Sequence, residues 1–276
     1  MPDLGLVKGI DVTRIAVVGG GVMGEALIVG LQRRLTPVPS IVVAEKREDR
    51  AADLAMRFGV QIAAPAAAVA GADVVIIVVK PQDFRSVVDQ IAADVPDGAL
   101  VISIAAGITT SSIEEAIPHA NVVRAMPNTP ARLELGVTGV SAGANCDRAA
   151  FARAEQLLAS VGTVISVPES LQDAITAVSG SGPAYVFFLA EAMMAGAMAV
   201  GLSTADARNA VLNTLLGAAH LLDVSGEEPA ALRAMVTSPG GTTAAAIAVL
   251  EKNETLDSFV AAIVAARDRS RELSAS

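Results

Sequence analysis

Short apolar segments alternate with segments of helical length from residue 14 to about residue 167. The apolar segments lie at residues 15–18, 41–44, 74–79, 100–104, 122–126, 137–141 and 164–167. Segments of helical length lie between several of them, at 48–58, 82–93 and 147–160. This alternation is typical of βαβ units, and segment 74–79, apolar at every position, fits a central strand covered on both faces. The pattern predicts an α/β domain with a mostly parallel sheet over residues 14–168.

After residue 168 the strand pattern stops and only helical segments follow. They are expected at 171–200, with a break near 180–183, and at 204–223, 229–236, 242–252 and 256–273. Gly201 fits a helix end, and Ser203 fits the N-cap of the next helix. We therefore predict an all-helical domain over residues 169–276. Residues 1–13 are expected to form a short flexible extension, because they lack the basic start and apolar core of a signal peptide.

Residues 19–24 read Gly-Gly-Gly-Val-Met-Gly, directly after the first expected strand and at the start of a helix. This fits the Gly-x-Gly-x-x-Gly fingerprint of dinucleotide-binding domains. In that fingerprint the first glycine permits a tight turn, the second lets the backbone approach the pyrophosphate, and the third lets helix and strand pack closely. The N–H groups of the helix start then bind the phosphates. We predict a Rossmann domain, with Gly19, Gly21 and Gly24 in these three roles.

The expected second strand ends in the charged residues Glu45, Lys46 and Arg47. A carboxylate at this position hydrogen-bonds the ribose 2′-hydroxyl and favours NAD, whereas neighbouring cations hold a 2′-phosphate and favour NADP. Because both kinds of group are present, the sequence leaves the choice between NAD(H) and NADP(H) open. Glu45 and Lys46 are both predicted to lie at the cofactor.

Two further turns follow expected strands, Val-Val-Lys-Pro at residues 78–81 and Ala-Ala-Gly at residues 105–107. Ligands of open α/β sheets bind outside the carboxyl ends of the strands, so both turns should face the same crevice as the glycine fingerprint. Lys80, at a strand end before a proline, is expected to contact the cofactor.

Composition narrows the classes of partner. Aromatic residues make up 3% of the 276 residues, and the formal net charge is −9. The sequence has no run of Lys and Arg, which argues against nucleic acid as a partner. Cys146 is the single cysteine, so neither an intrachain disulfide nor a cysteine-rich metal site is expected. We expect a cytoplasmic enzyme without a metal ion.

The most apolar stretch, residues 174–202, raises the question of a membrane. It contains Pro183 and, near its middle, Glu191. A helix that spans a membrane needs about 20 apolar residues without charge. We therefore interpret this stretch as helices buried in a subunit interface, and we expect no membrane partner.

The helical half restricts the chemistry because it offers few proton carriers. Residues 173–201 contain no Lys or His, whereas alcohol dehydrogenation needs such a general base near the hydroxyl. A protonated cyclic imine needs little acid–base help, since its carbon is already electrophilic. Tyr185 is interpreted as a packing residue at a helix entry rather than as a proton donor.

A Gly-rich loop, Thr-Ser-Pro-Gly-Gly-Thr-Thr at residues 237–243, leads into the helix expected from residue 242. Backbone N–H groups at that helix start, with the hydroxyls of Ser238 and Thr243, would suit a small anion such as a carboxylate. The same loop also fits a simple connection between helices with an N-cap threonine. The residues alone leave both interpretations open.

Three segments together resemble the signatures of pyrroline-5-carboxylate reductases. They are the loop 236–243 with Ala246, Ile247, Leu250 and Glu251 after it, Arg-Ala-Met-Pro-Asn-Thr-Pro at 124–130, and Ser-Gly-Ser-Gly-Pro-Ala-Tyr at 179–185. The resemblance covers residues 14–273 in the same order. It implies reduction of 1-pyrroline-5-carboxylate to L-proline, the last step of proline synthesis, by hydride transfer from NAD(P)H.

The resemblance also implies site residues and an assembly. The substrate would be held by Ser238, Gly241, Thr242 and Thr243, with Thr243 assigned to catalysis. The helical domain would form a homodimer in which both subunits build each site, alone or within a higher oligomer of dimers. The resemblance places at the cofactor Val18, Gly19, Gly21, Val22, Met23, Val78, Val79, Lys80, Pro81, Ala105, Ala106, Gly107, Met126 and Asn128. These residues join Gly24, Glu45 and Lys46, which are predicted above from their positions alone.

Two positions depart from the family pattern, and two other functions remain open. Pro65 stands where the family often has an asparagine near the adenosine, and Glu45 stands where many NADP-preferring relatives have a small polar residue. The alternatives are a reductase of another cyclic imine carboxylate and a nucleotide-binding module without catalysis.

Overall fold

The computed structural model describes residues 6–274, and for Val7 and Lys8 only the backbone. The chain divides into two compact units. The first runs up to Ser181 and takes in the residues from Ala266 on, and the second is Gly182–Ala265. The domain boundary expected at residue 168 lies before the division at Ser181, because residues 169–181 pack on the first unit.

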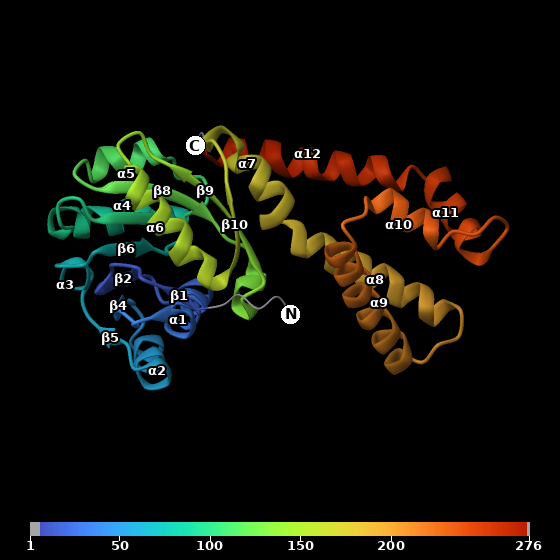
Figure 1. Ribbon diagram of the computed structural model, residues 1–276, viewed down its shortest axis with the longest axis horizontal. Coiled ribbons are helices and arrows are strands. Elements are labelled where there is room, and N and C mark those ends of the chain that lie inside the picture. Colours follow the sequence, from blue (N-terminus) through green and yellow to red (C-terminus); the bar gives the residue numbers. More distant parts are fainter. Residues whose placement is uncertain (1–5, 275–276) are drawn as a thin grey trace. The chain divides into compact units, whose positions relative to one another are not determined.

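The first unit is built on an eight-stranded sheet in the order β10-β9-β8-β7-β6-β2-β4-β5 (Figure 1). All neighbouring strands are parallel except β8 and β9, which confirms the mostly parallel sheet. The strands are β2 (Arg14–Val18), β4 (Ser40–Ala44), β5 (Gln61–Ile62), β6 (Val74–Ile77), β7 (Leu100–Ser103), β8 (Asn121–Met126), β9 (Gly136–Ala142) and β10 (Gly162–Ser166).

Helices cover both faces of this sheet, so side chains alternate between two cores. In β2, Ile15 and Val17 belong to one core, while Ala16 and Val18 belong to the other. The first core includes side chains of α1 (Val22–Arg34), α2 (Glu48–Phe58) and α6 (Arg148–Leu158). The second core includes side chains of α3 (Pro65–Val69), α4 (Pro81–Ile91) and α5 (Thr110–Ala116). The burial of all four residues of β6 fits the central strand predicted at 74–79.

The expected flexible extension is wrong for the part of it that the structure describes. Strand β1 (Val7–Lys8) pairs in parallel with β3 (Leu35–Thr36), and Val12 is buried in the first core. These residues are folded because the side chain of Val12 packs in the core with α1, and because β1 pairs with β3, which directly follows α1. Residues 1–5, also part of that prediction, lie outside the described residues.

The remaining helices begin with α7 (Gln172–Ile175), which continues into a π-helical turn, Thr176–Gly180. The break expected near 180–183 is therefore present. The second unit holds α8 (Gly182–Ala199), α9 (Thr204–Ser225), α10 (Pro229–Met235), α11 (Thr242–Lys252) and the first part of α12 (Thr255–Ser274). Ser203 caps α9 as predicted, since its hydroxyl accepts a bond from the Asp206 N–H at 3.1 Å.

The second unit leaves much apolar surface uncovered in a single chain. Phe187 and Phe188 on α8 are 63% and 67% exposed, and α10, α11 and α12 have no buried residue among those described. One helical stretch, residues 169–199, is apolar and long enough to span a membrane on length and composition alone. Large exposed apolar patches mark surfaces that another molecule or phase covers.

Candidate active site

The glycine fingerprint forms the tight turn between β2 and α1. Gly19 donates its N–H to the Ala44 carbonyl at 2.8 Å and has φ +112°, a conformation that L side chains rarely adopt. A Cβ on Gly19 would overlap the carbonyl oxygen of Val78, in the turn after β6. Only glycine therefore fits this position.

The other two fingerprint glycines differ in their surroundings. A Cβ on Gly24 would overlap the Gly19 carbonyl oxygen, so the predicted close packing of helix and strand is present. Gly21 is the N-cap of α1 and makes no side-chain cap, and among the described residues outside its immediate chain neighbours no atom lies within 4 Å of a Cβ placed there. The free N–H groups of the helix start thus face open space, which suits the pyrophosphate of a dinucleotide.

Glu45 lies against the fingerprint rather than in solvent. Its carboxylate accepts bonds from the N–H groups of Gly20 and Arg47, both at 3.0 Å, and its side chain is 8% exposed. Arg50 donates to the carbonyl oxygen of Gly20 at 2.9 Å, so the Gly20 peptide is held from both sides. Lys46 is 81% exposed and lies 3.8 Å from the carboxylate of Asp83.

The predicted cofactor turns meet at one edge of the sheet. Strands β2, β6, β7 and β8 are consecutive parallel neighbours in the sheet, so their carboxyl ends share that edge. Val18 and Ala105 are buried, Val78, Val79 and Gly107 are half-buried, and Lys80 and Ala106 are exposed. Pro81 is the first residue of α4. The arrangement places the turns after β2, β6 and β7 at one edge of the sheet.

Met126 ends β8 at the same edge and Asn128 follows two residues later, but Asn128 already has protein partners. Its amide nitrogen donates to the Ser179 carbonyl at 3.0 Å, and its amide oxygen accepts from the Val137 N–H at 2.9 Å. Asn128 is 8% exposed. Its side chain therefore braces the π-helical turn, a role that the sequence pattern did not suggest.

Loop 237–243 lies in the second unit. The N-cap of α11 is Gly241, without a side-chain cap, so the interpretation as an N-cap threonine is wrong. Thr242 and Thr243 are the first two residues of the helix, and the Gly241 N–H donates to the Ser238 carbonyl at 3.0 Å. Ser238 and Thr242 are exposed and Thr243 is half-buried. The helix start thus offers N–H groups and three hydroxyls to a small anion.

Cys146 has no part in this chemistry. Burial, with the nearby carboxylates of Asp147 and Glu114, raises the pKa of its thiol to about 11. The thiol is therefore protonated at neutral pH, and a protonated thiol is a poor nucleophile.

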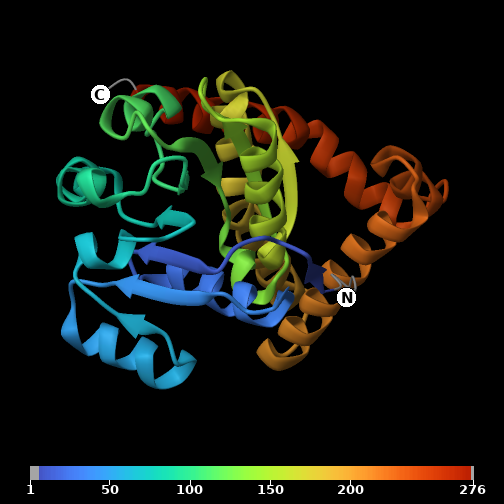
Figure 2. The same ribbon diagram turned by 60° about the vertical axis from the view of Figure 1, so that its left-hand side comes forward.

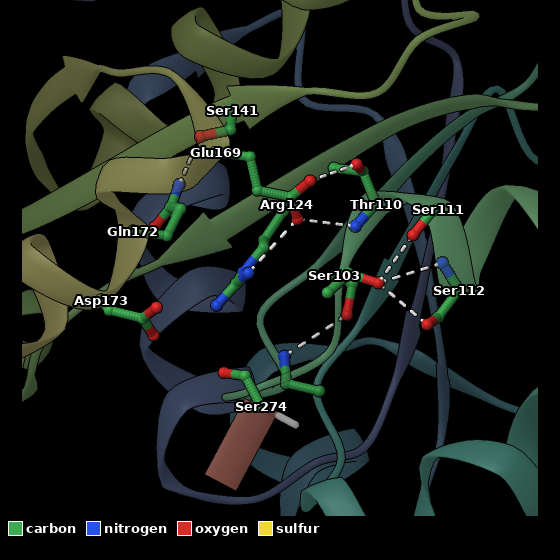
Figure 3. Close-up of polar contacts among 12 residues, drawn as sticks. Ser103, Thr110, Ser111, Ser112, Arg124, Ser141, Glu169, Gln172, Asp173 and Ser274 are labelled. Atoms are coloured by element: carbon green, nitrogen blue, oxygen red, sulfur yellow. Dashed lines mark hydrogen bonds and ion pairs between the residues drawn. The ribbon is translucent and has the colours of Figure 1, made fainter. Parts of the chain in front are cut away.

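The structure adds a polar cluster that the sequence analysis missed. Glu169 accepts bonds from Thr110 and from the buried guanidinium of Arg124, beside the turn after β7 (Figure 3). Arg124 lies in one of the motifs already singled out, but Glu169 and Thr110 lie in segments with no recognisable signal. Their partnership joins residues 59 positions apart.

Each half of the chain matches the model of a known protein family. Residues 169–273 match the family described as pyrroline-5-carboxylate reductase dimerisation, which indicates a homo-oligomer. Residues 14–107 match the family described as coenzyme F420-dependent NADP oxidoreductase. These matches confirm an N-terminal Rossmann domain followed by a helical dimerisation domain.

Three individual proteins are similar over nearly the whole chain. A pyrroline-5-carboxylate reductase of Synechocystis sp. is 40% identical, over 94% of this chain and 98% of its own. The structure of such a reductase from Coxiella burnetii is 35% identical, with a TM-score of 0.89 and coverage of 95% and 99%. That of Plasmodium falciparum pyrroline carboxylate reductase with NADP bound is 25% identical, with a TM-score of 0.84 and coverage of 96% and 98%. The chain belongs to the pyrroline-5-carboxylate reductases, a family of NAD(P)H-dependent oxidoreductases.

Proposed function

We propose that this chain reduces 1-pyrroline-5-carboxylate to L-proline, the last step of proline synthesis, in the cytoplasm. The observation that carries the proposal is the 40% identity to a reductase of this name along almost the whole chain. When bound, reduced NAD(P)H supplies a hydride to the carbon of the protonated C=N bond, and the nitrogen keeps its proton. The protein then has to bind, orient and shield the reactants.

The fingerprint turn is proposed to hold the cofactor pyrophosphate. The uncapped start of α1 and the open space at Gly21 support this role, with Val18, Val22 and Met23 beside it. The turns 78–81 and 105–107 would line the ribose and nicotinamide. For Asn128 we propose an indirect role through its bond to Ser179, and for Met126 a place beside the nicotinamide.

The start of α11 is proposed to hold the substrate carboxylate or the ring nitrogen. Ser238, Gly241, Thr242 and Thr243 would surround the anion. The absence of a side-chain cap at Gly241 leaves the N–H groups of Thr242 and Thr243 available, whereas the Gly241 N–H is bonded to the Ser238 carbonyl. Because the helix dipole is positive at this end, it favours a carboxylate. Thr243, half-buried in the first turn, is proposed as the catalytic contact.

Purified protein should oxidise NADPH or NADH when 1-pyrroline-5-carboxylate is added. The loss of absorbance at 340 nm measures this oxidation. Turnover of this imine and not of its six-membered homologue would separate the proposal from another cyclic imine reductase. Cofactor binding by calorimetry without oxidation on any imine would instead identify a nucleotide-binding module and refute the proposed activity.

The cofactor preference should depend on Glu45 and Lys46 in opposite directions. Glu45→Ser should raise the ratio of kcat/KM for NADPH to that for NADH by about tenfold, because a fixed carboxylate repels a 2′-phosphate. Lys46→Ala should lower the ratio by a smaller factor, since Lys46 is 81% exposed and screened by water. An unchanged ratio in Lys46→Ala would mean that Lys46 does not contact the 2′-phosphate.

We also propose that the exposed face of α8 is covered by a second copy of the chain rather than by a membrane. The dimerisation family match over this region and the exposure of Phe187 and Phe188 support a homodimer through the helical domain. Such a dimer would also allow each site to draw residues from both subunits, and dimers could assemble further.

Phe188→Glu should convert the assembly to monomers at micromolar concentration, because it places a charge in the centre of the apolar face. Sedimentation velocity would measure the mass. Met56→Glu is the matched control, since Met56 is 80% exposed on α2 of the Rossmann domain and should leave the mass unchanged. A wild-type chain that sediments as a monomer would exclude the dimer.

A further inference from the structure

A carboxylate after the last strand joins two segments at the nicotinamide edge of the sheet. Oε1 of Glu169 accepts from the Thr110 N–H at 2.7 Å and from Arg124 Nη1 at 3.2 Å, and Oε2 accepts from the Thr110 hydroxyl at 2.5 Å. Figure 3 shows this carboxylate between the two partners. The side chains of Arg124 and Glu169 are 7% and 29% exposed, so water screens the attraction between their charges less than in a fully exposed pair.

Both partners stand next to segments proposed to contact the nicotinamide. Thr110 is the first residue of α5, directly after the turn that begins at residue 105. Arg124 lies on β8, which ends at Met126. Glu169 opens the 3₁₀ turn Glu169–Leu171, from which the chain runs through α7 towards the second unit. One carboxylate therefore links the β7 turn, the β8 end and the segment that leads to the helical half.

Further contacts hold the two segments through which the chain enters and leaves the second unit. Both lie at the same edge of the sheet. The Asn128 side chain holds the π-helical turn before α8, through its bond to Ser179. On the returning helix α12, Ser270 donates to the carboxylate of Asp173 at 2.7 Å. The end of α12 also reaches the β7 turn, since a Cβ on Gly107 would lie 3.3 Å from the Leu273 carbonyl oxygen. In both views this end of α12, in red, lies beside α5, in green (Figure 1, Figure 2).

We propose that Glu169 is a positioning residue that fixes the nicotinamide turns relative to the segment carrying the helical half. This inference rests on the proposed function, because it assigns the two turns to the nicotinamide. Glu169 touches neither reactant in this account. Its loss loosens the β7 turn and the β8 end, and a misplacement of about 1 Å is enough to slow a reaction by up to ~100-fold.

The test compares Glu169→Gln and Thr110→Val with the wild type. Glu169→Gln removes the charge from the ion pair, and Thr110→Val removes one hydroxyl bond while keeping the shape and the N–H bond, so it serves if the first variant folds poorly. Glu115→Gln is the matched control, because it neutralises an exposed carboxylate on α5, the helix that begins at Thr110. Glu169→Asp tests rescue by a shorter carboxylate.

Three readouts distinguish positioning from a merely structural role. In Glu169→Gln, kcat should fall by about tenfold or more while the Kd of NAD(P)H, from nucleotide fluorescence, changes by less than about threefold. The kinetic isotope effect on kcat with cofactor deuterated at nicotinamide C4 should rise, because hydride transfer becomes slower. Amide deuterium uptake at 105–112 and 172–180 should also increase, with smaller changes in Thr110→Val and none in Glu115→Gln.

Wild-type uptake in both segments of Glu169→Gln overturns the proposal, as does a loss of kcat that only matches a loss of folded protein at an unchanged isotope effect. The uptake measurement needs no substrate. A wild type that fails to reduce the imine would therefore sink the proposed function, while the exchange result still decides whether Glu169 holds the two segments.

Discussion

Replacing Thr243 with valine should lower kcat/KM for 1-pyrroline-5-carboxylate by roughly 10- to 100-fold and leave the fold intact. Thr243 lies in the first turn of α11, whose N-cap, Gly241, supplies no side-chain cap. A hydrogen bond from a hydroxyl to a charged group contributes about 1.5–3 kcal/mol, which corresponds to this range. Valine keeps the branched shape and removes only the hydroxyl.

The division of the loss between kcat and KM identifies the atom that Thr243 contacts. A bond to the carboxylate exists equally before and during hydride transfer, so its loss should raise KM and leave kcat alone. A bond that the hydroxyl donates to the nitrogen lone pair, which forms only as hydride reaches the carbon, is made in the transition state alone, so its loss should lower kcat instead. Initial rates over a range of imine concentrations separate the two cases.

Two control variants accompany this measurement. Thr243→Ser keeps a hydroxyl and should retain most of the activity. Thr255→Val makes the same change at the first residue of α12 and should behave as the wild type. Activity of Thr243→Val at the wild-type level would remove this side chain from the mechanism.

The sheet and most helices could be predicted because their signals are local. The 74–79 segment is apolar on both faces since β6 is covered by helices on both sides. The predicted helix 48–58 matches α2 at both ends, and Gly59 in a left-handed conformation stops the helix at its C-terminus. Helix α11 also begins and ends at the expected residues. In each case the pattern of apolar side chains along the segment was the main signal.

The elements that escaped prediction are short or depend on distant partners. Strand β1 has two residues and exists only through its pairing with β3. Helix α5 carries Ser, Thr and Glu at most positions, and its N-cap is Thr109, whose hydroxyl accepts the Ser112 N–H at 3.2 Å. A segment of this composition also fits a loop, so periodicity does not single it out.

The candidate site divides in the same way. The fingerprint and the turns after β6 and β7 could be predicted, because strand ends of a parallel sheet converge whatever the rest of the chain does. The bonds of Asn128 to Ser179 and of Glu169 to Thr110 could not, since they join residues 51 and 59 positions apart. Long-range polar pairing leaves no trace in the local pattern, and only the fold reveals it.

The second large effect separates two glycines of one fingerprint that have the same residue type and different surroundings. Gly19→Ala should destabilise the Rossmann domain by about 1–3 kcal/mol or more, because φ +112° and the overlap with the Val78 carbonyl leave no place for a methyl group. Gly21→Ala should leave stability almost unchanged, since Gly21 has φ −65° and open space around it.

The two substitutions should also differ in how they weaken cofactor binding. Gly21→Ala should raise the Kd of NADPH and NADH at least about tenfold at an unchanged Tm, because the added methyl occupies the space in which the pyrophosphate approaches the backbone. Fluorescence titration and thermal unfolding measure the two quantities on the same sample. Tight binding by a folded Gly21→Ala protein would show that the pyrophosphate does not lie over this turn. In Gly19→Ala, by contrast, weaker binding follows from the lost fold, and Tm should fall with it.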